Sequence, residues 1–306
     1  MGQLTSTRVI FDETKSYITR TQASLVDIQR QISSGKQHDS FDDLVGNVTR
    51  LKALEDASGR LDSYLNSINR VKPRLQAADK TLEQLIDLGT ELRNSITLRK
   101  TPAGDTLDLA DIAGNILEQV EQLLNTSVDG QYIFAGGKSN AAPIKTTLDT
   151  VANYTSSATP FTTNTNYYLG DETDLSLRVS DGKEVTYNIK ASNAAFQQII
   201  SAAHLSIEVN ASEDNTVFTL AFDQVEAAIN SLISLRSQNA NNLSSLNNAA
   251  DLHEKAKSSL AEQIGDLTDT DIVQASIDVA FNETILTATF QTFARINNLK
   301  LLDFLT

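Results

Sequence analysis

Apolar side chains at both ends of the chain recur at the spacing of long amphipathic helices. In the N-terminal stretch they stand seven residues apart, at Leu4, Phe11, Ile18, Leu25 and Ile32. In the C-terminal stretch one row with this spacing comprises Ile272, Val279, Leu286 and Phe293, and a second row comprises Phe281, Ile285, Ala288, Ile296, Leu299 and Leu302. The spacings predict a helix at each end. The two rows of the closing helix, residues 272–305, form an apolar face too wide for one partner helix.

The same pattern predicts three more helices in the interior of the chain. The first covers residues 44–99, and we expect a kink or a short break near Pro73, because proline removes a backbone donor and clashes with the preceding turn. The second covers residues 109–124 and should pack against the first as an antiparallel hairpin. The third covers residues 217–264 and is ended by the polar residues 265–270.

Strand signals lie between these helices. Residues 131–135 form a short β-like run that two glycines close. Residues 138–215 are rich in Thr, Asn and Ser, and within them apolar side chains alternate on both sides of Asp181 and Gly182, which predicts a β-hairpin. A short helix is predicted at residues 196–203. This region is therefore expected to be a small α+β insert between helical halves.

The chain as a whole is predicted to be mainly α, a long antiparallel coiled-coil helical bundle from both chain ends with a small α+β insert domain. We expect three parts. Residues 1–43 and 266–306 form the paired terminal helices with a connector, residues 44–137 and 216–265 form a helical core with a short β-hairpin, and residues 138–215 form the outer insert.

Charge and composition exclude several classes of partner and of chemistry. The net charge is −14, from 39 acidic and 25 basic residues, so we expect neither nucleic acid nor an anionic membrane as a partner. The chain holds no cysteine, which excludes disulfides, thiolate nucleophiles and cysteine-ligated metals. No apolar run approaches the roughly 20 residues that span a bilayer, and the first residues lack the apolar core of a secretory signal. Export, if it occurs, is expected without a cleaved signal peptide.

The side chains that could carry chemistry are three histidines and two groups of acidic residues. They are His38, His204, His253, Asp42, Asp43, Asp266, Asp269 and Asp271. The histidines are far apart and lack a zinc-binding spacing. The later acidic group lacks the central glycine and final glutamate of a calcium loop, and the earlier pair has no cleft or second acid pair beside it. We therefore predict no catalytic residue, no cofactor and no metal site.

Two kinds of function remain. In the first, the protein is structural, and its terminal helices pack against copies of itself or a related chain. In the second, the helices form a monomeric coiled-coil scaffold that presents residues 138–215 as a binding module. The two differ in whether the terminal helices are ordered in a dilute monomer, which proteolysis would show.

Three segments of the sequence carry a resemblance to a known family. Gln29 to Lys36, with Asp42, Asp43 and Gly46, resembles the N-terminal segment of bacterial flagellins and their relatives, and Ala294 to Leu299 with Leu301 to Leu305 resembles their C-terminal end. Gly130 to Lys138, with Ala141, Ala142 and Pro143, is similar to the hook–filament junction members of that family more than to filament flagellins. The likeness covers about residues 1–145 and 216–306 and is much weaker in the insert.

The resemblance implies a non-enzymatic axial protein of the flagellum, located outside the cell after export through the flagellar type III apparatus. Its implied partners are copies of itself in a ring or helical layer, the other hook-associated junction protein, flagellin and an export chaperone. A divergent filament flagellin is the alternative. The residues expected at the assembly interface are Leu4, Phe11, Ile18, Leu25, Ile32, Ile272, Val279, Phe281, Leu286, Phe293, Leu299 and Leu302.

Overall fold

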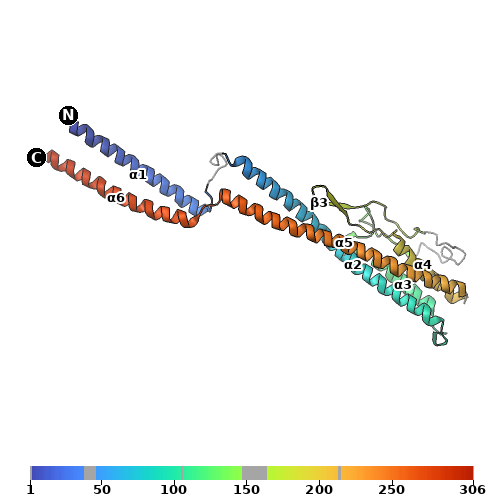
Figure 1. The fold of residues 1–306 in the computed structure, drawn as a ribbon. Helices are drawn as coiled ribbons and strands as arrows, with labels where there is room; N and C mark the ends of the chain where they lie inside the picture. Colours follow the sequence, from blue (N-terminus) through green and yellow to red (C-terminus); the bar gives the residue numbers. More distant parts are fainter. Residues whose placement is uncertain (1, 38–45, 105, 147–163, 213–214, 306) are drawn as a thin grey trace. The chain divides into compact units, whose positions relative to one another are not determined.

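The computed structural model describes residues 2–37, 46–104, 106–146, 164–212 and 215–305 (Figure 1). The described chain is mainly helical and divides into two compact units. The terminal unit comprises Met1–Arg60 and Ala256–Thr306, and the core unit comprises Leu61–Lys255. The mainly α prediction is confirmed. The division into three parts stays a prediction, and His38, Asp42 and Asp43 lie outside the described residues.

Helices α1 (Gly2–Ser34) and α6 (Ile272–Leu305) lie side by side and antiparallel in the terminal unit (Figure 1). Local chemistry fixes the two inner ends of this pair. Gly35 has a φ of 70° and donates its amide to the carbonyl of Gln31, which ends α1 in the left-handed conformation that glycine favours. At the start of α6, the Asp271 carboxylate accepts the amide hydrogens of Val273 and Gln274, both at 3.0 Å.

The second long helix, α2 (Val48–Arg99), continues through Pro73, so the predicted short break is absent. The reason is burial on both sides of the proline. Ile68, Val71 and Leu75 are all buried and belong to one apolar cluster with Val179 and other side chains. Packing of these side chains offsets the backbone hydrogen bond that proline cannot make.

A 3-10 turn, η2 (Pro102–Gly104), leads into α3 (Leu109–Leu124), whose bounds agree with the prediction. Asp108 caps α3, because its carboxylate accepts the amides of Ala110 and Asp111 at 3.1 and 3.2 Å. Every third or fourth side chain of α3 is buried in a large cluster shared with α2, α4 (Ala194–Ser212) and α5 (Asn215–Thr268). This shared cluster forms the hydrophobic core of the unit.

Two small antiparallel sheets complete the core unit. Strands β1 (Ser127–Val128) and β2 (Gln131–Tyr132) pair across an Asp-Gly turn with positive φ at both residues, so the predicted run at 131–135 is a strand only at its start. Strands β3 (Ser176–Ser180) and β4 (Lys183–Thr186) form the predicted hairpin, with Leu177 opposite Val185.

Polar side chains of α5 fix its position along α2. The Arg236 guanidinium contacts the Asp79 carboxylate at 3.1 Å and the Glu83 carboxylate at 3.2 Å. The buried Asn239 donates from Nδ2 to the carbonyl oxygen of Leu75 at 2.9 Å. Because each bond holds in one register only, these residues specify how α5 pairs with α2.

Two helix ends differ from the sequence-based expectation. Helix α2 begins at Val48 rather than residue 44, and α5 continues through Gly265 to Thr268 rather than ending at 264. The last turn of α5 is completed by the Thr268 hydroxyl, which donates to the Ile264 carbonyl at 2.9 Å, and by the Asp269 amide, which donates to the Gly265 carbonyl at 2.7 Å. The expected short helix at 196–203 lies within the longer α4.

Candidate assembly interface

The seam between α1 and α6 contains members of the predicted sevenfold rows. The rings of Phe11 and Phe293 are tilted by 36° with their centroids 4.9 Å apart, and Leu25 is buried. The α1 side chains that are buried or half-buried are Phe11, Thr14, Ile18, Thr21, Leu25, Ile28, Gln31 and Ile32. Those of α6 include Ala275, Val279, Asn282, Leu286, Thr289 and Phe293. The spacing of three and four in both sets is that of an antiparallel coiled-coil seam.

Not every predicted interface residue lies in the seam between α1 and α6, and the assembly interface itself stays a prediction. Ile272 is 53% exposed and lies outside the seam, which on α6 begins with the buried Ala275. Sequence reasoning passed over Ala275 because the next positions at its sevenfold spacing, Asn282 and Thr289, are polar. Leu4, Leu299 and Leu302 lie in the helical backbone of α1 and α6, and their side chains fall outside the described ones.

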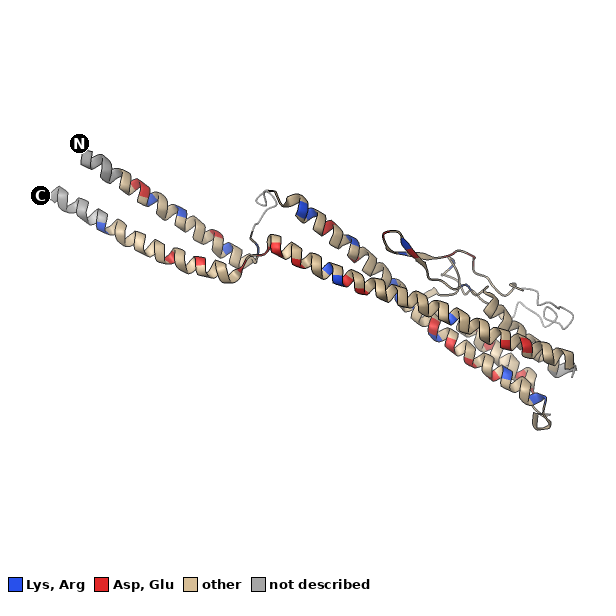
Figure 2. Cartoon of the chain, viewed as in Figure 1, with Lys and Arg blue, Asp and Glu red and all other residues tan. Residues whose placement is uncertain are grey.

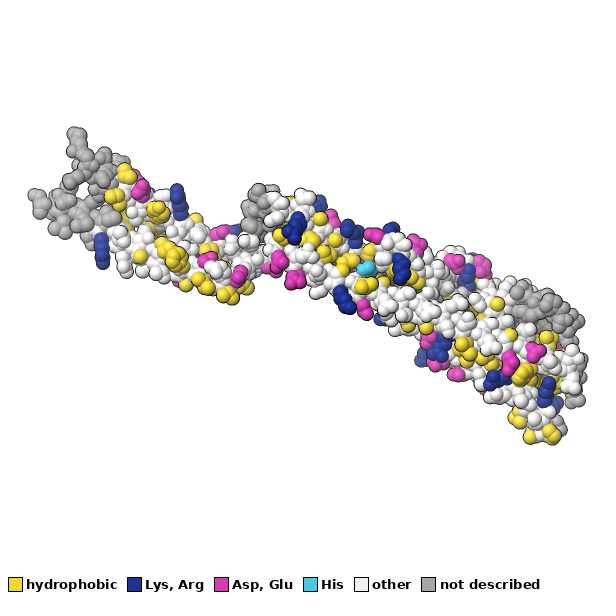
Figure 3. Space-filling model, viewed as in Figure 1, with side chains coloured by type: hydrophobic (Ala, Val, Ile, Leu, Met, Phe, Trp, Pro, Cys, Tyr) yellow, Lys and Arg dark blue, Asp and Glu magenta, His cyan; other side chains and the backbone are white. Residues whose placement is uncertain are grey.

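A second apolar row on α6 faces away from α1. Val273, Ile277 and Phe281 have 72%, 57% and 64% of their side-chain surface exposed, and Ile285 has 37%. At about 100° of rotation per residue, the centre of this row lies about 140° around the helix from the centre of the seam. Figure 3 shows hydrophobic side chains along this part of the chain. Of this row, Phe281 and Ile285 were predicted, and Val273 and Ile277 were not.

A groove runs between α1 and α6 beside the seam and borders the second row. Its volume is about 320 Å³, and its walls include Tyr17 from α1 and Ile285 and Ala288 from α6, with threonines around them. Tyr17 is 65% exposed, and nearby Ile10 is 46% exposed. The groove therefore extends the apolar face of α6 onto α1.

The threonines of this surface present methyl groups rather than free hydroxyls. On α6, Thr284, Thr287, Thr289 and Thr292 each donate their hydroxyl hydrogen to the carbonyl four residues earlier, at 2.8 to 2.9 Å. Thr14 does the same on α1. Because these donors are satisfied within the helix, another helix can cover the threonines without leaving a hydroxyl hydrogen unpaired.

Charged side chains are sparse on this helix. Between residues 272 and 294 of α6 the charged positions are Asp278 and Glu283 (Figure 2). A helix that is apolar on more than one side is normally covered on more than one side. The exposed surface of α6 is therefore suited to packing against a helix of another protein chain.

A small clasp joins the inner ends of the pair. Gln37 donates its amide to the Thr268 carbonyl at 2.8 Å, and Thr270 donates its amide to the Gly35 carbonyl at 3.0 Å, which makes an isolated antiparallel bridge. Across it the Lys36 ammonium contacts the Asp269 carboxylate at 2.6 Å. This hydrogen bond from Lys36 lowers the pKa of the Asp269 carboxyl below its ordinary value. The clasp therefore fixes the point where α1 ends and α6 begins, and with it the register of the antiparallel pair.

Two of the other side chains considered for catalysis or metal binding make contacts that stabilise the fold. His253 is buried and its Nε2 lies 2.6 Å from the Val179 carbonyl oxygen, while Asp271 caps α6. His204 is buried in α4, and Asp266 is exposed on α5. Within the described residues, no group of three metal-binding side chains comes together. None of the helices described has the length and apolar character needed to cross a membrane.

Comparison with known proteins shows what the chain is similar to. Residues 5–139 match the family described as bacterial flagellin N-terminal helical region. A solved structure assigned as a flagellar hook-associated protein from Vibrio parahaemolyticus has the same fold, with a TM-score of 0.56 and 14% identity over 72% of this chain and 96% of that one. The crystal structure of Bacillus cereus FlgL is also similar, with a TM-score of 0.38 and 18% identity over 69% of this chain and 97% of that one. No curated protein matches the chain. Over residues 5–139 the chain is therefore similar to the N-terminal helical region of bacterial flagellins.

Proposed function

We propose that this protein is a structural, non-enzymatic axial component of the bacterial flagellum that joins hook to filament. The observation that carries the proposal is the exposed apolar row of α6, at Val273, Ile277 and Phe281, opposite the seam with α1. One chain leaves this row uncovered, and neighbouring subunits in a ring or helical layer would bury it. The hook-associated assignment of the Vibrio structure and the likeness of residues 130–138 to junction members favour the junction over the filament.

The energy of assembly would come from apolar surface that the single chain leaves in water. Full burial of a side chain such as Ile277 or Phe281 stabilises by roughly 1.5–3 kcal/mol. The satisfied threonine hydroxyls and the few charges of α6 keep the opposing polar cost small. A layer of subunits would therefore hold together through its terminal helices, with the other hook-associated protein on one side and flagellin on the other.

Partners and location follow from the same proposal. Before assembly the terminal helices would be carried by a flagellar export chaperone, and the chain would leave the cell through the flagellar export apparatus rather than by a cleaved signal peptide. Its place is then extracellular, at the end of the hook. A divergent filament flagellin is the second candidate, because the matched family is described by the flagellin N-terminal region.

A strain that lacks the gene separates these two functions. Loss of a junction protein leaves complete hooks and releases flagellin monomer into the medium, whereas loss of the filament protein leaves hooks and no released flagellin. Both outcomes are read by electron microscopy and by immunoblot of the culture medium. Hooks that still carry stable filaments would rule out both functions.

Truncation tests the role of the terminal helices. Removing residues 1–30 or 276–306 should abolish filament attachment in a complemented strain and leave the helical signal and melting transition of residues 50–265 in place. The matched control is Leu252→Asp, an exposed apolar position of α5 in the core unit. Filament attachment retained after either truncation would contradict assembly through the terminal helices.

A further inference from the structure

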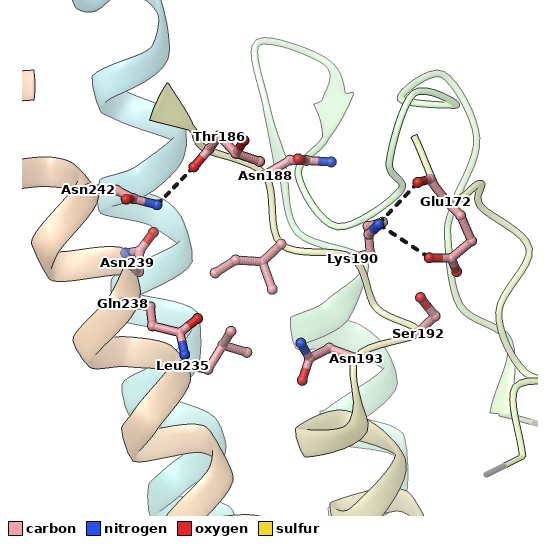
Figure 4. A pocket seen from close by; sticks show the side chains of 11 residues that line it. Glu172, Thr186, Asn188, Lys190, Ser192, Asn193, Leu235, Gln238, Asn239 and Asn242 are labelled. Carbon is pink, nitrogen blue, oxygen red and sulfur yellow. Dashed lines mark hydrogen bonds and ion pairs between the residues drawn. The ribbon is translucent and has the colours of Figure 1, made fainter. Parts of the chain in front are cut away.

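A polar cleft of about 440 Å³ lies in the core unit, far in sequence from the terminal helices. One wall is α5, from Leu235 to Asn242, and the other is the segment that follows β4, from Thr186 to Asn193 (Figure 4). A volume of this size is within the range of small-molecule sites in proteins. The proposed assembly function makes no use of it.

The charged side chains that line the cleft are Lys190 and Glu172, and Lys190 pairs with Glu172 and with Asp174, which lies outside the lining. The Lys190 ammonium donates to the Asp174 carboxylate at 2.9 Å and to the Glu172 carbonyl at 3.0 Å, and it lies 3.4 Å from the Glu172 carboxylate. These contacts use the three hydrogens of the ammonium group. Hydrogen bonding to Asp174 also raises the pKa of Lys190, so the group stays charged and paired. An anionic ligand therefore finds no unpaired cation among the described residues that line the cleft.

The remaining polar groups are neutral and include donors and acceptors. Within the described part of the chain, the side-chain amide of Gln238, the Ser192 hydroxyl and the Asn242 Oδ1 have no side-chain or backbone partner, although Asn242 Nδ2 donates to the Thr186 carbonyl at 2.9 Å. Asn239 Oδ1 also has no partner among the described residues, but it is closed to solvent and so lies out of reach of a ligand in the cleft.

Apolar side chains lie among these amides. Ile189 and the buried Leu235 belong to the lining, and Figure 4 shows Leu235 beside Gln238 on the α5 wall. A sugar ring combines the matching properties, because it has hydroxyl groups around its edge and C–H groups on its faces. It is also neutral, as the paired charges of the cleft require.

We propose that this cleft binds a neutral saccharide unit, held by the amides of Gln238 and Asn242 and the Ser192 hydroxyl, with its C–H face on Leu235 and Ile189. The sugar is a free molecule or part of a glycan chain. The ligand class follows from the absence of spare charge and the mixture of neutral donors and acceptors. Binding here would add a recognition function to the core unit, independent of the terminal helices.

The test is a titration of the full chain with glucose and N-acetylglucosamine, followed by the side-chain amide signals of Asn and Gln in NMR spectra. Saturable shifts of the Gln238 and Asn242 amides are expected, and glycerol should produce none. Glucose 6-phosphate should bind no more tightly than glucose. Shifts that stay linear with concentration, or equal shifts with glycerol, would overturn the proposal.

Variants locate the binding. Gln238→Leu removes hydrogen bonds to the sugar and should weaken binding by a factor of roughly 2 to 10, and Ser192→Ala should have a similar effect. The control is Gln291→Leu, which removes an exposed amide from α6 outside the cleft. Equal weakening by the control would refute the site. Chitotriose binding more tightly than N-acetylglucosamine assigns a glycan chain, and weaker binding assigns a free sugar.

Discussion

The terminal unit and the core unit differ in how far they bury the same kind of apolar pattern. Among the described side chains of the terminal unit, the buried apolar ones are Leu25, Leu51 and Ala275. In the core unit, α2, α3, α4 and α5 share one large cluster of fully buried side chains. Both units have long helices with apolar rows. The comparison shows that a helical pattern predicts where apolar side chains lie, while its burial depends on how many partners one chain supplies.

The largest effect is expected from a charge in the core. Leu92 is fully buried in the main cluster, and Leu92→Asp replaces its packing with an unpaired carboxylate. The expected cost is about 4 kcal/mol or more, a large share of the total stability of a domain. Circular dichroism during thermal unfolding should show the core transition lost or strongly lowered. The control Leu92→Met should keep it, and an unchanged transition in Leu92→Asp would contradict the burial of this position.

A charge in the terminal seam should act on one unit only. Leu286 is half-buried between α6 and α1, and Leu286→Asp should separate the two helices, because a carboxylate in an apolar seam costs several kcal/mol when it is covered. Limited proteolysis should cut residues 2–34 and 272–305 faster while the core transition stays in place. Leu286→Met is the conservative control. Loss of the core transition would show that the two units unfold together.

A charge on the second apolar row of α6 tests the assembly of subunits separately from the pairing of α1 with α6. Phe281 is 64% exposed, so Phe281→Asp should change the stability of the free chain by no more than about 0.5 kcal/mol and yet abolish filament attachment. Leu252→Asp, at a position 66% exposed in the core unit, is the matched control and should attach normally. Motility and electron microscopy of complemented strains provide the measurement. Normal filament attachment by Phe281→Asp would show that the second apolar row is not part of the assembly interface.

The smallest effect is expected at the clasp. The folded-state pKa of Asp269 lies below its unfolded value, so the Lys36 contact contributes stability above the unfolded pKa and loses it as pH falls through the folded pKa. The pair is exposed, which limits its contribution to about 1 kcal/mol or less. Hydrogen exchange of the Gln37 and Thr270 amides should quicken in Asp269→Asn at neutral pH. Asp278→Asn, in α6 of the same unit but outside the clasp, should leave both rates unchanged.

Sequence periodicity predicted the helical elements well where the signals were local. The bounds of α3 follow from its regular apolar spacing and from the capping side chain of Asp108. The hairpin of β3 and β4 follows from alternation around Asp181 and Gly182. In each case the residues that define the element also determine its ends, so the neighbouring parts of the chain add little information.

Prediction was weaker where distant residues decide the structure. Burial of Ile68 and Leu75 carries α2 through Pro73, and a local rule for proline has no access to that packing. The end of α5 at Thr268 is set beside the clasp with Lys36, a residue more than 200 positions away in sequence. The residues Val273 and Ile277 of the second apolar row on α6 were also missed. Their exposure becomes evident only when α1 has been placed on the other face of α6.

The clasp at Lys36 and Asp269 also has a topological consequence. It ties two points separated by 233 positions, so every residue between them forms one closed loop on the base of the terminal pair. The entropy of closing a loop grows only with the logarithm of its length, by about 0.6 kcal/mol for each doubling. The loop could thus gain or lose whole segments, such as the insert around β3 and β4, with almost no change at its base. A chain of this design can vary the length of the loop and keep its pair of terminal helices unaltered.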